Sequence, residues 1–276
     1  MINGINSREM ILEILLEIEE GEHSHVAIRN ALSKYQFLPK QDRAFITRVC
    51  EGTLEYRIQI DYIINSFSKV TVDKMKPAIR EILRSAVYQL KYMDSVPDSA
   101  VCNEAVKLAQ RKGFYNLKPF VNGVLRTIAR EMDQVRFPQK EDDLLKYLSV
   151  KYSMPEVLVT RWLEAYGEET TEKILADFLM EHPLTIRCRT YLNSKEEVIK
   201  SLESQGVHVA PAPYLPYAYS ISEFNHILAL DAFIKGKIVV QDVSSMLVAE
   251  VADPKKGDYV IDVCAAPGGK SLHMGD

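Results

Sequence analysis

Long hydrophobic runs are missing from this chain of 276 residues. No stretch reaches the roughly 18 consecutive apolar residues that a membrane-spanning helix requires, so we expect no membrane partner. The first residues also lack the basic start and apolar stretch of a secretory signal peptide. Hydrophobic residues make up 47% of the chain and charged residues 26%, which is typical of a soluble globular protein. The length predicts two domains of ordinary size.

Cysteine is scarce and widely spaced. The four cysteines, Cys50, Cys102, Cys188 and Cys264, form no C-x-x-C pair, and the six histidines show no metal-ligand spacing. We therefore expect reduced thiols in a cytoplasmic protein and no metal site. The first three cysteines fall on apolar faces of expected helices or strands, where core packing is the usual role of a free cysteine.

Positive charge is not in excess over the whole chain, but it is concentrated locally. The net charge of −4 gives no overall attraction to nucleic acid. Residues 102–130 nevertheless contain six basic side chains and only one acidic side chain, Glu104. The residues alone leave two interpretations open, a solvated helix surface and a face that contacts phosphates.

The first 135 residues are predicted to be helical throughout. The clearest helix is expected from Pro77 to about Tyr92, because apolar residues recur there at helical spacing and proline suits the first turn. Asn6 is a predicted N-cap, and further helices are expected over about 41–56, 61–67, 99–111 and 117–132. Short connections and the lack of a strand pattern predict an all-α domain over 1–135.

The second half has a different organisation. Residues 136–143 are polar and predict a linker, and short helices over about 155–166 and 169–180 complete a connecting region, 136–180. A small α+β module is expected over 181–235, with strands at 184–190, 207–210 and 217–221 and a helix ending near 205. Residues 236–276 are expected to begin an α/β domain, with strands at 238–241 and 260–263.

The glycine turn after the second of these strands is the main candidate site. A phosphate-binding P-loop needs G-x-x-x-x-G-K-[ST], but Cys264 stands where its first glycine is required. The G-x-G-x-x-G pattern of a dinucleotide site is also missing. An S-adenosylmethionine site fits better, because it needs an acidic residue near the strand end, here Asp262, and small residues on which the cofactor can lie. Lys270 in the first helical turn is consistent with an anionic ligand or with a solvated side chain.

These residues carry a family resemblance. The segment Asp262-Val-Cys-Ala-Ala-Pro-Gly-Gly-Lys270 resembles the cofactor-binding motif of RNA cytosine-C5 methyltransferases. Upstream, Gln241-Asp-Val-Ser-Ser245 resembles the segment that leads to this motif in the same family. The resemblance implies S-adenosylmethionine as cofactor and a Rossmann-type methyltransferase domain. The implied cofactor-binding residues are Cys264, Ala265, Ala266, Pro267, Gly268, Gly269 and Lys270. Cys264 is expected to line the pocket and not to act as the nucleophile.

The N-terminal half carries a second resemblance. Segments 42–54, 96–106 and 120–126 resemble the RNA-binding helical domain of the antitermination factor NusB. A NusB-like domain joined to this cofactor motif is the layout of the bacterial small-subunit ribosomal RNA cytosine-C5 methyltransferases of type B, whose RNA-recognition-like module the residues 181–235 resemble. Small-subunit ribosomal RNA is therefore the implied partner. The basic residues expected to contact it are Arg111, Lys112, Lys118, Arg126, Arg130, Arg187 and Arg189. The last two stand where the family usually has Arg-x-Asn.

The same resemblance implies where the chemistry takes place. Family members use one cysteine to add to C6 of cytosine and a second to help remove the C5 proton. These cysteines are expected beyond residue 276, so no catalytic residue is predicted within this chain. We expect an N-terminal fragment that alone neither methylates RNA nor binds the cofactor tightly. The alternative is a NusB-like RNA-binding module without catalysis. The sequence predicts no oligomeric state.

Overall fold

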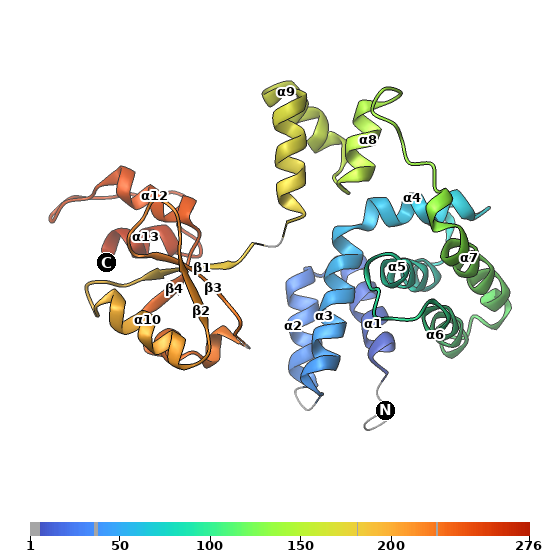
Figure 1. Cartoon of the computed structure of the whole chain (residues 1–276), viewed down its shortest axis with the longest axis horizontal. Helices are drawn as coiled ribbons and strands as arrows, with labels where there is room; N and C mark the ends of the chain where they lie inside the picture. Colours follow the sequence, from blue (N-terminus) through green and yellow to red (C-terminus); the bar gives the residue numbers. More distant parts are fainter. Residues whose placement is uncertain (1–5, 36–37, 181, 225) are drawn as a thin grey trace. The chain divides into compact units, whose positions relative to one another are not determined.

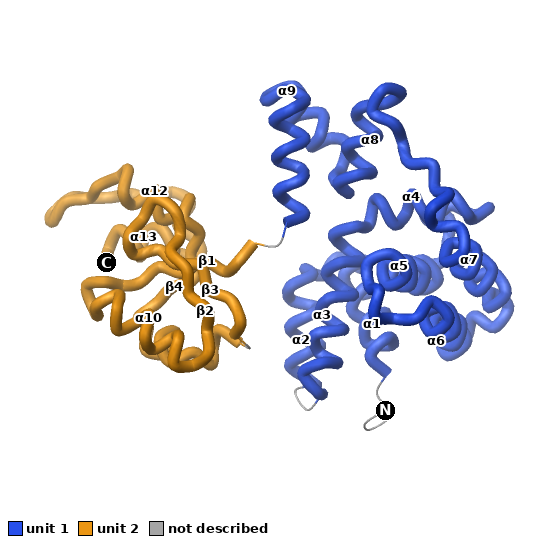
Figure 2. Tube along the Cα trace, viewed as in Figure 1, with its two compact units in different colours: residues 1–180 blue, residues 181–276 orange. Residues whose placement is uncertain are grey.

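The computed structural model describes residues 6–35, 38–180, 182–224 and 226–276. The chain divides into two compact units, residues 1–180 and 181–276 (Figure 2). Each unit has its own hydrophobic core. No helix among the described residues is long and apolar enough to cross a membrane.

The first unit is all helical, as predicted, and is built around α5 (Figure 1). Ile79, Ile82, Leu83 and Val87 of α5 are buried against the surrounding helices, so the apolar stripe that predicted this helix is also the centre of the core. The helices of this part are α1 (Ser7–Glu19), α2 (Ser24–Lys34), α3 (Lys40–Glu55), α4 (Arg57–Phe67), α5 (Pro77–Tyr92), α6 (Asp98–Arg111) and α7 (Lys118–Glu131), with the short 3₁₀ helices η1 (Val72–Lys74), η2 (Tyr115–Leu117) and η3 (Met132–Gln134).

Local sequence signals explain where several of these helices begin and end. The side chain of Asn6 accepts a hydrogen bond of 2.9 Å from the backbone N–H of Arg8, which confirms the predicted N-cap of α1. Pro77 occupies the first turn of α5. Gly113 has a φ of 84° just after α6, a conformation that glycine adopts without strain.

Gly52 allows α3 and α5 to approach each other closely. A Cβ atom at this position would overlap the ring of Tyr88, which is only 6% exposed. Tyr88 belongs to a cluster of three tyrosines, with ring centroids 6.4 Å from Tyr56 and 5.3 Å from Tyr92. The absence of a side chain at Gly52 is therefore a packing requirement of this core.

The segment predicted as a linker has a fixed path along the first unit. The ring of Phe137 stacks on that of Tyr62 with centroids 5.7 Å apart, and the Tyr62 hydroxyl donates a 2.7 Å hydrogen bond to the carbonyl of Arg136. Helices α8 (Leu144–Lys151) and α9 (Glu156–Phe178) follow. Gly167, with φ 73° and ψ 174°, divides α9 into the two helical stretches that the sequence predicts.

The second unit contains a four-stranded antiparallel sheet in the order β2-β3-β1-β4. Alternate residues of β1 point to opposite faces: Ile186 and Cys188 pack with Val198 and Leu202 of α10. On the other face, Met246 of α12 packs against the sheet (Figure 1). The elements are β1 (Leu184–Cys188), α10 (Lys195–Ser204), β2 (His208–Pro211), β3 (Ala218–Ser222), η4 (Ile227–Ala229), α11 (Asp231–Ile234), β4 (Ile238–Val240), α12 (Val243–Ala252) and α13 (Gly269–Gly275).

Two sequence-based expectations for the end of the chain differ from the structure. Strand β4, assigned above to the start of an α/β domain, instead pairs antiparallel with β1, because Ile238 completes the core of the small module. The segment 260–263 is not a strand. It finds no pairing partner among the described strands, and its side chains stay in solvent, Val263 being 90% exposed.

Candidate cofactor site

The glycine turn is held in shape by Asp262. One carboxylate oxygen accepts a 3.1 Å hydrogen bond from the backbone N–H of Cys264, and the other accepts a 2.6 Å hydrogen bond from the Ser271 hydroxyl. The hydrogen bond from Ser271 is the main reason why the pKa of Asp262 lies below its usual value. Asp262 therefore ties the start of the turn to α13.

Gly268 gives the turn its sharp bend. Its φ of +103° lies in the region that favours glycine, and its carbonyl accepts a 2.8 Å hydrogen bond from the N–H of Leu272. At the next residue, Gly269, a Cβ atom would meet nothing within 4 Å. The backbone is thus open to solvent on the side where a ligand can approach.

A cavity of about 220 Å³ lies beside this turn. Gly268 shapes the turn but does not line the cavity. Asp242 and Ser245 were not among the predicted binding residues, although their segment carried part of the family resemblance. The residues that line the cavity are Val240, Gln241, Asp242, Ser245, Cys264, Ala265, Ala266, Pro267, Gly269 and Lys270.

The lining fits the predicted cofactor. Small side chains and a glycine leave backbone accessible, while Asp242 and Lys270 offer one charge of each sign. S-adenosylmethionine carries an ammonium, a carboxylate and a sulfonium, so a wall with both signs of charge matches its chemistry. These are the described residues that could hold a cofactor of this kind.

Arg187 lies beneath this site and not on the surface. It is only 3% exposed, and its guanidinium donates to the Gln241 side chain at 3.0 Å and to Asp276 at 2.6 Å. Arg189 also binds Asp276, at 2.7 Å, and lies over the ring of Tyr191. Burial favours a higher pKa for Asp276, but the hydrogen bonds from Arg189 and Arg187 lower it to about 2. The expected phosphate contact of Arg187 is not possible from this buried position.

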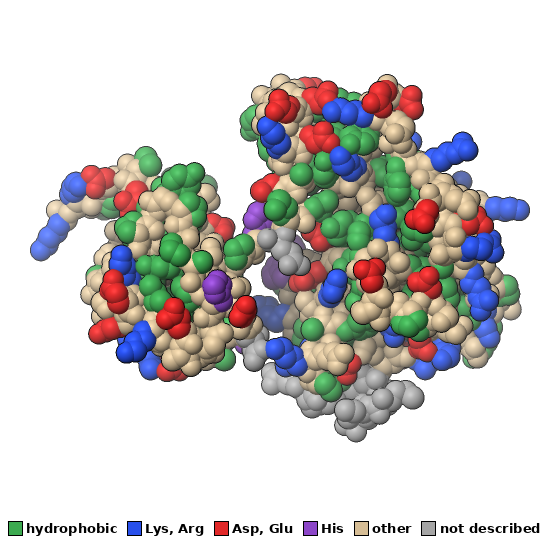
Figure 3. Space-filling model, viewed as in Figure 1, with side chains coloured by type: hydrophobic (Ala, Val, Ile, Leu, Met, Phe, Trp, Pro, Cys, Tyr) green, Lys and Arg blue, Asp and Glu red, His purple; other side chains and the backbone are tan. Residues whose placement is uncertain are grey.

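The basic residues of the helical unit that were predicted to contact RNA lie on or next to α6 and α7, and Figure 3 shows Lys and Arg side chains along that edge of the unit, among others elsewhere on its surface. Lys112 and Arg130 are paired with acidic neighbours: Lys112 lies 3.0 Å from Glu13, and Arg130 lies 2.6 Å from Glu131. No ion pair with a carboxylate is shown among the described residues for Arg111, Lys118 or Arg126, although the charge of Arg111 helps to lower the pKa of Glu104. Lys118 donates to Gln110 at 2.9 Å and Arg126 donates to Asn122 at 3.0 Å, so both keep their positive charge uncompensated.

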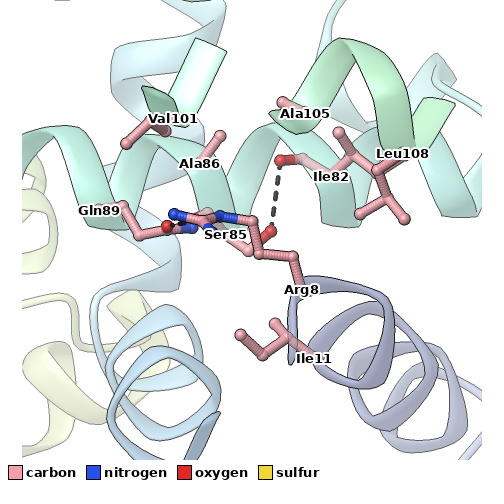
Figure 4. A pocket seen from close by; sticks show the side chains of 9 residues that line it. All are labelled: Arg8, Ile11, Ile82, Ser85, Ala86, Gln89, Val101, Ala105 and Leu108. Carbon is pink, nitrogen blue, oxygen red and sulfur yellow. Dashed lines mark hydrogen bonds between the residues drawn. The ribbon is translucent and has the colours of Figure 1, made fainter. Parts of the chain in front are cut away.

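A second cavity lies between α1, α5 and α6 (Figure 4). Its volume is about 10 Å³, which is room for about one water molecule. Arg8 donates a 3.2 Å hydrogen bond to Gln89 across it. Burial lowers the pKa of Arg8, and the charge of Glu104 partly opposes this. This cavity is a gap in the packing and is too small for a cofactor.

Comparison with known proteins finds one family match in each half of the chain. Residues 5–130 match the NusB family, and residues 154–227 match the ferredoxin-like domain described as Methyltr_RsmF/B-like. The chain is therefore similar to a NusB-family domain in its first part and to an RsmF/B-type ferredoxin-like domain in its second part. The β1-α10-β2-β3-α11-β4 order and the sheet order agree with the second assignment.

Relatives share this layout over almost the whole chain. The chain is 34% identical to the probable ribosomal RNA small subunit methyltransferase B of Bacillus subtilis, over 98% of this chain and 59% of the relative. It is 31% identical to the protein of the same name from Synechocystis, over 99% of this chain and 61% of the relative. The crystal structure of PH0851 superposes with a TM-score of 0.72 at 27% identity, covering 98% of this chain and 61% of that one. The chain thus spans about three fifths of the length of these proteins.

Proposed function

We propose that the protein transfers a methyl group from S-adenosylmethionine to C5 of a cytosine in small-subunit ribosomal RNA, in the cytoplasm. One observation carries this proposal: the segment 262–270 has the composition of the family's cofactor motif and borders a cavity whose walls suit that cofactor. The names of the relatives, which are ribosomal RNA small subunit methyltransferases, support the same reaction class.

The residues of the site have distinct proposed roles. S-adenosylmethionine supplies an electrophilic methyl group when it is bound. The turn from Cys264 to Lys270 forms one wall of its pocket, and Asp242 and Ser245 offer polar contacts on the other wall. Asp262 keeps the turn in its bent form. We assign Cys264 to the wall, and we assign no catalytic residue to this chain.

The α6–α7 face is the proposed RNA contact of the helical unit. Lys118 and Arg126 bind only neutral side chains there, Arg111 lies near Glu104, and Lys112 and Arg130 are ion-paired with carboxylates. Uncompensated cations release counterions when they bind phosphates, so they contribute more to RNA affinity than paired ones. In the second unit, Arg189 is partly exposed but is ion-paired with Asp276 at 2.7 Å, so by the same reasoning we expect it to contribute less to phosphate binding than an unpaired cation.

Bisulfite mapping of ribosomal RNA tests the proposed reaction. Cells that lack the complete gene are expected to lose one 5-methylcytosine from the small-subunit RNA, and the intact gene is expected to restore it. An unchanged pattern of 5-methylcytosine would reject the proposal. If the protein still bound ribosomal RNA in that case, the NusB-like RNA-binding module without catalysis would become the better account.

A further inference from the structure

Arg187 is a buried charge on an inner strand of the sheet. Its backbone lies opposite Ala218 of β3 and Val239 of β4, with strands on both sides. Because Ile186 and Cys188 point into the core beneath α10, the side chain of Arg187 projects from the other face. A buried guanidinium destabilises a fold unless its N–H groups find acceptors, so the identity of those acceptors is informative.

Gln241 is the acceptor that links Arg187 to the cofactor turn. It is 7% exposed, and its backbone N–H donates to the carbonyl of Thr185 at 3.2 Å, which fixes it to β1 just after β4. Its side-chain oxygen accepts the 3.0 Å hydrogen bond from Arg187 Nε. Its side-chain nitrogen donates to the carbonyl of Gly269 at 3.3 Å.

The chemistry of arginine decides which way the Gln241 amide points. A guanidinium has only donors, so the oxygen of the amide must face Arg187. The amide nitrogen is then turned toward Gly269, whose carbonyl can only accept. The three groups form a directed chain of hydrogen bonds from the rigid sheet to the first residue of α13, in the wall of the cavity.

We propose that Arg187 and Gln241 are positioning residues that anchor the glycine turn to the ferredoxin-like sheet. Arg187 orients the amide of Gln241, and Gln241 holds the carbonyl of Gly269, so the small module sets the geometry of the cofactor wall. The biological meaning of this anchor rests on the proposed cofactor function. The anchor itself can be measured without any cofactor.

Hydrogen–deuterium exchange of the full-length protein tests the anchor through Gln241→Glu. The new carboxylate still accepts from Arg187, so the buried charge remains paired, but it can no longer donate to Gly269. Loss of one hydrogen bond is expected to raise exchange about fivefold in a peptide covering 264–272, with little change over 184–188 and 218–222. Tyr219→Phe is the matched control: it removes a 3.4 Å hydrogen bond to Pro216 on the opposite side of the same sheet, and exchange at 264–272 should not change.

Arg187→Lys and the double variant with Gln241→Glu complete the test. A lysine keeps the positive charge but lacks the rigid guanidinium that orients the amide, so it should also speed exchange at 264–272. Because both residues act through one chain, the effect of the double variant should be smaller than the product of the two single effects. Unchanged exchange at 264–272 in Gln241→Glu would overturn the anchor, and so would faster exchange spread evenly over the sheet.

Addition of S-adenosylmethionine separates this inference from the proposed function. In the unaltered full-length protein, the cofactor should slow exchange at 264–272, and Gln241→Glu should weaken that protection. If the cofactor changes nothing while the variants behave as described without it, the proposed cofactor function fails and the anchor stands.

Discussion

Replacing Gly52 with alanine should destabilise the helical unit, although alanine normally stabilises a helix. In a helix interior, alanine is favoured over glycine by about 1 kcal/mol. At Gly52, however, the added Cβ would overlap the ring of Tyr88, which is 6% exposed and packed against Tyr56 and Tyr92. Overpacking of this kind typically costs about 1–3 kcal/mol. Subtracting the helix preference of alanine from this cost, we expect Gly52→Ala to lower the free energy of unfolding by up to about 2 kcal/mol.

Urea denaturation followed by circular dichroism measures this effect, because a lower midpoint at constant slope reports a loss of stability. Gly123 in α7 provides the control. A Cβ there meets nothing within 4 Å, so Gly123→Ala should stabilise by about 0.5–1 kcal/mol.

The Tyr88→Leu background tests the cause. Leucine lacks the outer ring atoms that the new Cβ would overlap, so Gly52→Ala should become neutral or stabilising in this background. If Gly52→Ala stabilises the protein that retains Tyr88, or destabilises both backgrounds equally, the packing argument is refuted.

Three further predictions concern surface and thiol chemistry. Glu172 accepts a 2.9 Å hydrogen bond from Lys151, and this bond is the main reason why the pKa of Glu172 is lowered to about 2. The contribution of Glu172 to stability is therefore fully present above its unfolded pKa of about 4.3 and is lost as the pH falls toward 2. Glu172→Gln should make the melting temperature depend less on pH between these values. An unchanged dependence of melting temperature on pH would contradict this. Arg126→Gln should weaken ribosomal RNA binding and reduce the slope of log affinity against log salt by about one. Lys112→Gln should have a smaller effect, because Lys112 is already ion-paired with Glu13. Equal effects of the two substitutions would contradict this distinction. A thiol reagent should label only Cys264 in the native protein, because the other cysteines are buried, and labelling of a second cysteine before unfolding would be inconsistent with the core.

The periodic spacing of apolar residues predicted those helices whose own sequence carries a clear apolar stripe. The stripe on α5 and the proline at its start were sufficient for that helix. Helix α2 was missed because it buries only Ala27 and Ile28 and has no side-chain hydrogen bond at its N-cap. Helix α8 was missed as well, because it is short and follows a polar segment that resembles a linker.

The remaining differences depend on contacts between distant segments. Residues 260–263 have the composition of a strand, but a strand also needs a neighbour that accepts its backbone hydrogen bonds. Alternation along β1 places Arg187 on the face opposite Ile186, yet nothing near Arg187 in the sequence reveals that Gln241, 54 residues later, would bind it. The cofactor motif was found from its composition, whereas Asp242 and Ser245 joined its cavity only through the fold.

The central claim is that the turn at 264–270 holds the methyl donor for modification of cytosine. The most direct test incubates the full-length protein with radiolabelled S-adenosylmethionine and unmethylated small-subunit ribosomal RNA, followed by nucleoside analysis. Gly269→Val is the matched variant: a Cβ at this position meets nothing within 4 Å, and a branched side chain there is expected to occupy part of the cavity that Gly269 lines. Label is expected in 5-methylcytosine with the unaltered protein and is not expected with the folded variant. Label in another nucleoside, or equal transfer by both proteins, would contradict the claim.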